Sequence, residues 1–166
     1  MIRRLGSHAG KRILFGYDRY LIPDLDVYRD LLLGLGRELI EAVDVGQIHY
    51  LTSAERVCRA IQQDPDSFGI LCCGTGMGMS IAANKFPGIY AARCTTVEDA
   101  EMSRQINNAN VLCIAAKQGF DVNRAILEAF ARTHYTGRKL DELEYITRFE
   151  QGAPAASESR PMLRTA

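Results

Sequence analysis

The stretch that decides the fold is Phe68-Gly-Ile-Leu-Cys-Cys-Gly-Thr-Gly-Met-Gly-Met-Ser80. Its first part, residues 68–74, is short, apolar and closed by glycine, which is typical of a strand buried on both faces of a parallel sheet. Glycines then dominate the loop, and the pattern over 79–85 indicates a helix. A strand, a glycine-rich loop and a helix in this order predict an α/β fold.

Further apolar runs alternate with helical patterns along the chain, at residues 11–18, 39–46, 88–94 and 110–116. This alternation predicts a three-layer, doubly wound α/β fold, flavodoxin-like or Rossmann-like, with five parallel strands and a C-terminal helix over roughly 139–150. We expect the flavodoxin-like strand order 2-1-3-4-5. Ligands of such sheets bind beyond the carboxyl ends of the strands, where the strand order reverses. Asp18 and Cys73 follow two of these ends.

The length of 166 residues suits one domain. We expect a flexible N-terminal arm over 1–10, one domain over 11–150, and a flexible tail over 151–166 that is rich in Ala, Ser and Pro. The chain carries 20 basic and 20 acidic residues, so no net charge attracts it to nucleic acid or to an acidic membrane. No apolar run is long enough to span a bilayer. We therefore expect neither nucleic acid nor a membrane as a partner.

The five cysteines are odd in number and lack the recurring C-x-x-C spacing of a metal site. We expect free thiols in a reducing cytoplasm and no bound metal. The adjacent Cys72 and Cys73 should point to opposite faces of their strand. Core packing explains the other four cysteines, whereas Cys73 lies at the glycine loop.

The loop after Cys73 has the features of an anion site. Its glycines let the backbone approach a ligand closely, and a strand–loop–helix junction aims free N–H groups at one point. The helix start also favours a thiolate. The sequence is neither a Walker A motif nor G-x-G-x-x-G, and no arginine lies five residues after either Cys72 or Cys73. From the residues alone, a tight β–α turn around a core cysteine remains the alternative.

The longer segment 69–94, GILCCGTGMGMSIAANKFPGIYAARC, resembles the ribose-5-phosphate isomerase type B and galactose-6-phosphate isomerase family. The resemblance continues in residues 107–113, in Gly16-Tyr17-Asp18, in Asp44-Val45-Gly46 and in Tyr50. It covers roughly residues 11–150.

The resemblance implies an aldose–ketose isomerase of a small sugar phosphate that needs no cofactor and no metal. Cys73 is expected to be the base that moves a proton between C1 and C2 through an enediolate, and Thr75 to assist proton movement at the hydroxyls. The resemblance and the loop together give the expected substrate-binding residues, which are Asp18, Arg19, Tyr50, Gly74, Gly76, Gly78, Ser80, Asn107, Lys117 and Arg138. The family also implies a homodimer or a dimer of dimers whose pocket is shared between chains, with Arg138 reaching across.

The sequence departs from the family pattern at four places. Arg19 stands where the family often has histidine, and Ile106 replaces a histidine that helps to open the sugar ring. His49 precedes Tyr50 where aspartate is usual, and Glu142 lies where an arginine is common.

The loss at Ile106 leads to a hypothesis about the substrate. A tetrose with phosphate on O4 cannot close the usual five-membered ring, so it needs no ring-opening group. We therefore expect a tetrose or pentose phosphate, with the four-carbon sugar preferred. Three alternatives stay open: His49 or Arg19 replaces the missing histidine, the chain is a non-catalytic or partner subunit, or the sugar carries no phosphate.

Overall fold

A computed structural model describes residues 3–151, and its centre is one parallel sheet. The strands are β1 (Arg12–Tyr17), β2 (Glu38–Glu41), β3 (Ser67–Cys73), β4 (Ala91–Arg93) and β5 (Val111–Ala115). They lie in the order β2-β1-β3-β5-β4. The predicted α/β class and the five parallel strands are confirmed, although β2 and β4 are shorter than the apolar runs that indicated them.

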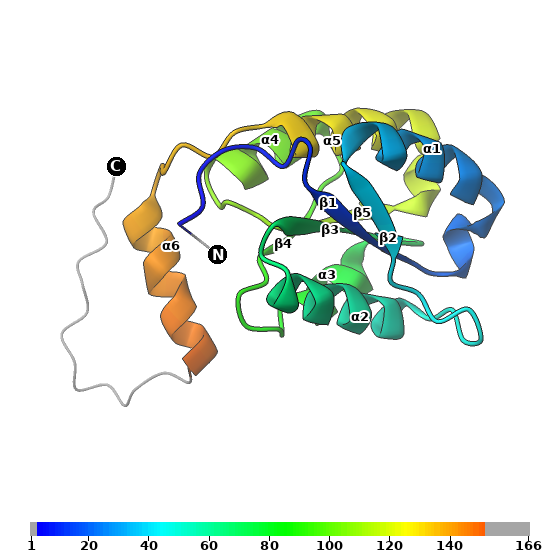
Figure 1. The fold of residues 1–166 in the computed structure, drawn as a ribbon, viewed down its shortest axis with the longest axis horizontal. Helices are drawn as coiled ribbons and strands as arrows, with labels where there is room; N and C mark the ends of the chain where they lie inside the picture. Colours follow the sequence, from blue (N-terminus) through cyan, green and yellow to red (C-terminus); the bar gives the residue numbers. More distant parts are fainter. Residues whose placement is uncertain (1–2, 152–166) are drawn as a thin grey trace.

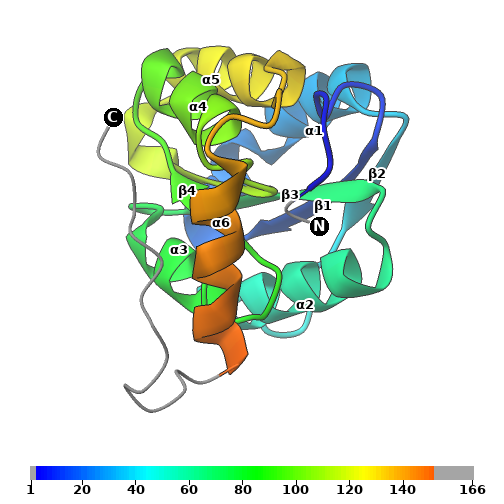
Figure 2. The same cartoon turned by 90° about the vertical axis from the view of Figure 1, so that its left-hand side faces the viewer.

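Helices cover both faces of the sheet (Figure 1). One layer holds α1 (Leu25–Leu35), α4 (Val97–Gln105) and α5 (Phe120–Arg132), and the other holds α2 (Tyr50–Gln63) and α3 (Met77–Ala83). Two 3-10 turns, η1 (Arg19–Asp24) and η2 (Ala116–Gln118), follow β1 and β5 directly. The C-terminal helix α6 (Leu140–Thr147), continued by η3 (Arg148–Gln151), stands beside the β4 edge (Figure 2).

The predicted order of the last two strands is wrong, because β5 and not β4 pairs with β3. All five residues of β5 are buried, whereas the three of β4 are only half-buried. The more apolar strand therefore takes the inner position. The short edge strand finds a second partner in Asn84, whose side-chain amide both donates to and accepts from the backbone of Ala91. Such cover protects an edge from pairing with another chain.

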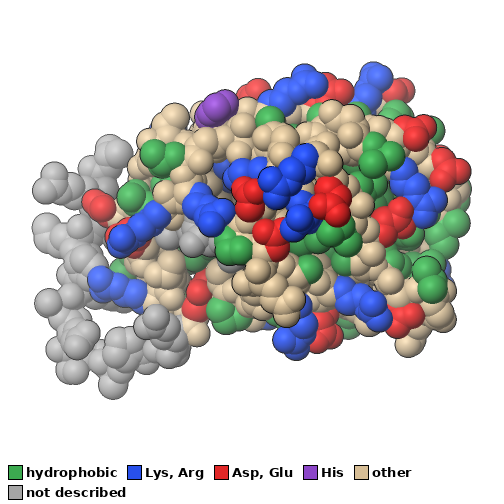
Figure 3. Space-filling model, in the orientation of Figure 1, with side chains coloured by type: hydrophobic (Ala, Val, Ile, Leu, Met, Phe, Trp, Pro, Cys, Tyr) green, Lys and Arg blue, Asp and Glu red, His purple; other side chains and the backbone are tan. Residues whose placement is uncertain are grey.

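Part of the expected N-terminal arm packs against the domain. A β-bridge joins Gly6 to Tyr135, and the His8 side chain is buried. Residues 1–2 and almost all of the expected tail over 151–166 lie outside the described residues. Every helix within 3–151 is too short or too polar to span a bilayer. Basic and acidic side chains are interspersed on the face seen in Figure 3.

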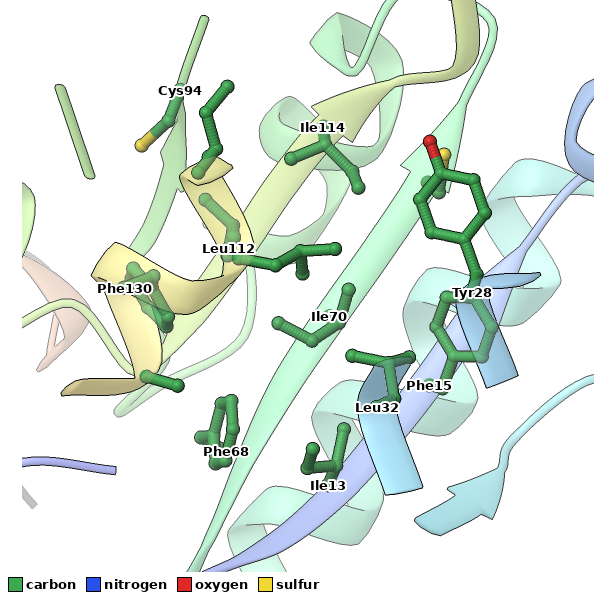
Figure 4. Packing of buried hydrophobic residues seen from close by; sticks show 14 of the residues in the cluster. Ile13, Phe15, Tyr28, Leu32, Phe68, Ile70, Cys94, Leu112, Ile114 and Phe130 are labelled. Carbon is green, nitrogen blue, oxygen red and sulfur yellow. The ribbon is translucent and has the colours of Figure 1, made fainter. Parts of the chain in front are cut away.

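The core is divided by the sheet into two apolar layers. Figure 4 shows the layer under α1, α4 and α5, where Phe15, Ile70 and Leu112 from three strands meet Tyr28 and Phe130 from the helices. The other layer packs α2 and α3 against the alternate strand residues, including Leu71, Cys73 and Cys113. Adjacent Cys72 and Cys73 thus lie on opposite faces, as their spacing predicts.

We expect Gly69→Ala to destabilise the protein, because α2 lies directly on β3 at this point. An added Cβ would stand 2.8 Å from a Val57 methyl group and 2.9 Å from one of Ile61. Overpacking of this kind costs about 1–3 kcal/mol in the free energy of unfolding. Urea unfolding monitored by circular dichroism measures the change.

Gly34→Ala is the matched control for that measurement. A Cβ at Gly34 meets no atom within 4 Å, and the residue lies inside α1. Alanine there should stabilise the helix by about 0.5–1 kcal/mol. Equal effects of the two substitutions would contradict the close α2–sheet packing.

Candidate active site

A cavity of about 200 Å³ opens at the carboxyl ends of β1, β3 and β5. Its walls come from the turns that follow these strands and from the start of α2 and α3. The lining residues are Asp18, Tyr20, Tyr50, Cys73, Gly74, Thr75, Gly78 and Lys117. This is the edge of the sheet at which doubly wound folds bind ligands.

The Cys73 sulfur lies at this cavity and accepts a hydrogen bond from the backbone N–H of Gly76 at 3.2 Å. A thiolate is stabilised by such a donor. The first hydrogen bond of α3 runs from Ser80 N–H to the Gly76 carbonyl at 3.2 Å. The N–H group of Gly78 precedes that bond and lies at the cavity, so it can donate to a ligand.

Two contacts fix the shape of the glycine loop. Gly76 has φ of +72°, and a Cβ there would stand 3.1 Å from the Ile114 backbone, so only glycine fits without strain. Arg93 on β4 donates from Nε to the Thr75 carbonyl at 2.8 Å. The loop is therefore fixed by the neighbouring strand β5 and by the edge strand β4 beyond it.

Two tyrosine rings lie directly on the loop glycines. A Cβ at Gly74 would stand 3.2 Å from the Tyr20 ring, and a Cβ at Gly78 would stand 2.8 Å from the Tyr50 ring. Both tyrosines line the cavity. Because Gly74 and Gly78 have no side chain, the two rings can pack against the loop and form walls of the cavity. These walls limit the space beside Cys73.

Asp18 organises the turn that carries Tyr20. Its side chain is buried, and Oδ1 accepts a hydrogen bond from the Tyr20 N–H at 2.9 Å as the N-cap of η1. The Arg19 guanidinium lies 5.3 Å from the centre of the Tyr20 ring. On the far wall, the Lys117 N–H donates to the Gly74 carbonyl at 3.4 Å, which ties η2 to the glycine loop.

The other four cysteines are poor candidates for a base. Burial raises the pKa of Cys58 to about 12 and that of Cys94 to about 11. Burial likewise raises the pKa of Cys72 and Cys113. All four are essentially inaccessible, and all five cysteines are free. Within 3–151, no three His, Cys, Asp or Glu side chains converge in a way that could hold a metal ion.

The structure brings together seven of the residues expected from the sequence, namely Asp18, Tyr50, Cys73, Gly74, Thr75, Gly78 and Lys117. Gly76 is buried beneath the loop, and Ser80 lies within α3. Arg19 is exposed at the rim, next to Tyr20. None of these three residues lines the cavity.

Asn107 and Arg138 do not line the Cys73 cavity of the same chain. Asn107 lines a second cavity of about 310 Å³, between the β4 edge and α6. Ile106 precedes it as the C-cap of α4. Arg138 is exposed in the link between α5 and α6.

Two of the residues that depart from the family pattern, His49 and Glu142, interact with neighbours in their own helix or next to it. His49 is the N-cap of α2, where Nδ1 accepts from the Leu51 N–H at 3.3 Å, and it does not line the Cys73 cavity. Glu142 lies 3.4 Å from the Lys139 ammonium.

Tyr20 and Arg93 were missed by the sequence analysis. Tyr20 follows Asp18 by two positions at a strand end, which is a usable signal for a cavity wall. Arg93 gave no such signal, because only the pairing of β4 with β5 places it beside the loop.

Comparisons with known proteins agree on one family. A model of the family described as Ribose/Galactose Isomerase matches residues 28–146. A ribose-5-phosphate isomerase B from Escherichia coli K12 is 34% identical over 148 residues, which are 85% of this chain and 97% of that protein. The structure of a type B ribose 5-phosphate isomerase from Leishmania infantum is similar, with a TM-score of 0.79 and 36% identity over 86% of this chain and 97% of the other.

Two further relatives carry names that refer to four-carbon compounds. A D-erythrulose-4-phosphate isomerase from Pectobacterium atrosepticum is 37% identical over 89 residues, which are 53% of this chain and 59% of that protein. A 4-deoxy-4-sulfo-D-erythrose isomerase from Clostridium sp. MSTE9 is 38% identical over 104 residues, which are 61% of this chain and 65% of that protein.

We expect iodoacetamide to alkylate Cys73 first in the native protein, because it lines the cavity of about 200 Å³, whereas the other four thiols are buried in the core. The reacting form is the thiolate. With pKa values of about 12 and about 11, Cys58 and Cys94 are ionised only to about 10⁻⁴ and 10⁻³ at pH 8, and the fraction rises as the pH approaches those values. Peptide mass spectrometry after timed labelling should show Cys73 reacting at least about tenfold faster. Equal labelling of Cys58 in folded protein would contradict this geometry.

Proposed function

We propose that this chain, which belongs to the ribose/galactose isomerase family, isomerises a short sugar phosphate with Cys73 as its base. Its activity is that of an aldose–ketose isomerase. The observation that carries the proposal is the position of the Cys73 sulfur at the sheet-edge cavity, beside Thr75 and hydrogen-bonded by the loop backbone.

The proposed reaction moves one proton between two neighbouring carbons of the substrate and needs no external oxidant or reductant. The Cys73 thiolate takes the proton from the carbon beside the carbonyl, and the electron pair of that C–H bond forms the C=C bond of an enediolate. The same thiol then returns a proton to the neighbouring carbon, while the hydroxyl proton moves to the former carbonyl oxygen. A base of this kind contributes about 10²–10⁴-fold to the rate.

The loop and the cavity rim supply the other groups. Charge that develops on the carbonyl oxygen is stabilised by fixed donors, and the N–H group of Gly78 at the cavity is suited to this role. Thr75 is proposed to relay the hydroxyl proton, with Asp18 orienting the hydroxyls. Lys117 in the cavity and Arg19 at the rim provide positive charge for the phosphate.

Three observations support a four-carbon substrate. Tyr20 and Tyr50 wall the cavity at both ends of the glycine loop. Ile106 cannot transfer a proton, and a tetrose 4-phosphate has no ring to open through its blocked O4. Two relatives are named for four-carbon compounds, erythrulose 4-phosphate and a sulfo-erythrose, which supports a short substrate here. A five-carbon substrate, as named for the Escherichia coli relative, is the competing outcome.

We further propose that two copies complete each site. Asn107 lies at the second cavity and Arg138 in the exposed link before α6, both away from Cys73 of their own chain. In a symmetric dimer, the same two patches meet twice, so the region around Asn107 and Arg138 would face the partner's Cys73 cavity. A reducing, cytoplasmic location is part of the proposal, because all five thiols are free.

We expect Cys73→Ser to lower kcat/KM by about 10²–10⁴-fold with the fold unchanged. Serine preserves the size of the side chain, but its hydroxyl is a far weaker acid and so supplies almost no base near neutral pH. Cys72→Ser is the matched control, because its side chain faces the other core layer. Comparable losses in two folded proteins would remove Cys73 from the role of base. Steady-state kinetics and circular dichroism give the comparison.

We expect wild-type protein to prefer a tetrose phosphate to a pentose phosphate, and Tyr20→Ala to shift the ratio of kcat/KM values towards the pentose by about tenfold, or ~1.4 kcal/mol. Removing the ring widens the cavity next to Gly74. Leu33→Ala, on the exposed surface of α1 and outside both cavities, should leave the ratio unchanged. A wild-type preference for the pentose above about tenfold would sink the short-substrate hypothesis.

We expect two inactive variants, Cys73→Ser and Asn107→Ala, to restore activity when they are mixed and allowed to exchange subunits. Half of the dimers would be mixed, and one of the two sites in each would be intact, so about a quarter of wild-type activity should return. Activity that stays at the level of the separate variants, although mass spectrometry detects mixed dimers, would rule out shared sites.

A further inference from the structure

We propose that the amino-terminal edge of the sheet holds a binding site for one chloride-sized anion, formed by Arg104, Lys11 and Arg4. These residues line a small cavity of about 20 Å³ that also includes Ser67. Lys11 immediately precedes β1, and Ser67 begins β3, so this cavity lies at the opposite end of the strands from Cys73. The proposal does not rest on the isomerase chemistry.

Arg104 provides the first argument, because it is a buried charge with uncharged partners. Its side chain is 1% exposed. The guanidinium donates to three neutral oxygens, the Asn108 side-chain oxygen at 2.9 Å and the carbonyls of Ala109 and Gly6. Its Nε has no hydrogen-bond partner among residues 3–151. A buried charge of this kind is costly unless a counter-charge or further hydrogen bonds compensate it.

The residues around Arg104 add a second positive charge and only little negative charge to balance it. Burial and the positive charge of Arg104 lower the pKa of Lys11. Asp66 acts electrostatically on Lys11, but it already forms an ion pair with Arg37 at 2.9 Å. The ring of Phe130, 5.8 Å from the Arg104 guanidinium carbon, supplies only a weak cation–π contact.

His8 shapes the site without adding a further positive charge. Burial lowers its pKa well below the usual value, so the ring is neutral. Its Nε2 must donate to the Ala109 carbonyl at 3.0 Å, which leaves Nδ1 as an acceptor for the Lys11 ammonium at 3.5 Å. His8 therefore holds Lys11 beside the cavity.

The size and the lining select the ligand class. The cavity beside Arg104 is about ten times smaller than the Cys73 cavity, and its volume suits one water molecule or an ion of similar size. A sugar phosphate does not fit. The lining offers guanidinium and ammonium groups, which carry positive charge and donate hydrogen bonds but cannot accept them.

The test compares thermal unfolding in sodium chloride with unfolding in sodium methanesulfonate at the same ionic strength. Methanesulfonate is too large for the cavity. An anion that binds only the folded state raises Tm with its concentration. We expect chloride to raise the Tm of wild-type protein by about 3 °C relative to methanesulfonate. Lys11→Met should lose most of this difference, whereas Lys117→Met, which alters the other cavity, should keep it.

Two results would overturn the proposal. One is an equal chloride effect in wild-type and Lys11→Met protein, and the other is a loss confined to Lys117→Met. If Lys11→Met does not fold, crystals of wild-type protein soaked in sodium bromide decide the question. The proposal requires an anomalous bromide peak beside Arg104, and its absence while surface sites are occupied contradicts it. Loss of activity in Cys73→Ser leaves these outcomes unaffected, so the two proposals fail independently.

Discussion

The hydrogen bond from the Gly76 N–H to the Cys73 sulfur is the interaction on which the rest of the site depends. It forms only because the loop turns through a positive φ at Gly76, against the backbone of Ile114. That contact requires β5 to lie next to β3. The same pairing brings Lys117 to the loop, where its N–H meets the Gly74 carbonyl. The pairing of β3 with β5 therefore sets the loop conformation, and the loop conformation sets the cavity.

Much of this could be predicted from the sequence, because the apolar runs and the glycine loop are local signals. The sheet and the loop followed from them, and the seven cavity residues followed from the loop together with the family resemblance. The order of β4 and β5 did not, since both runs are apolar and only their final burial separates an edge strand from an inner one. Tyr20 and Arg93 were missed for a related reason. Their roles arise from contacts between elements, with Gly74 and Thr75. The place of Tyr20 at a strand end is a signal for a cavity wall, whereas no spacing along the chain encodes the contact of Arg93.

Polar and charged groups are arranged differently at the two ends of the strands. At the carboxyl ends, backbone N–H groups and Lys117 offer donors around an open cavity of about 200 Å³. At the amino ends, Arg104 is buried among neutral acceptors, and the N-terminal segment closes over it through Gly6 and His8. Hydrogen-bond donors at an open cavity suit a substrate that exchanges with solvent. A buried positive charge covered by the N-terminal segment suits a ligand that stays bound. The bridge from Gly6 to Tyr135 makes the N-terminal segment part of the fold rather than a free arm.

The direct measurement of the role of Cys73 is solvent deuterium incorporation during turnover of tetrose, pentose and hexose phosphates in deuterated water. With wild-type protein, deuterium should enter at the carbon beside the carbonyl of the preferred substrate, at a rate comparable with isomerisation. With Cys73→Ser that exchange should disappear, while Cys72→Ser retains it. Exchange by folded Cys73→Ser protein at the wild-type rate would show that another group removes the proton.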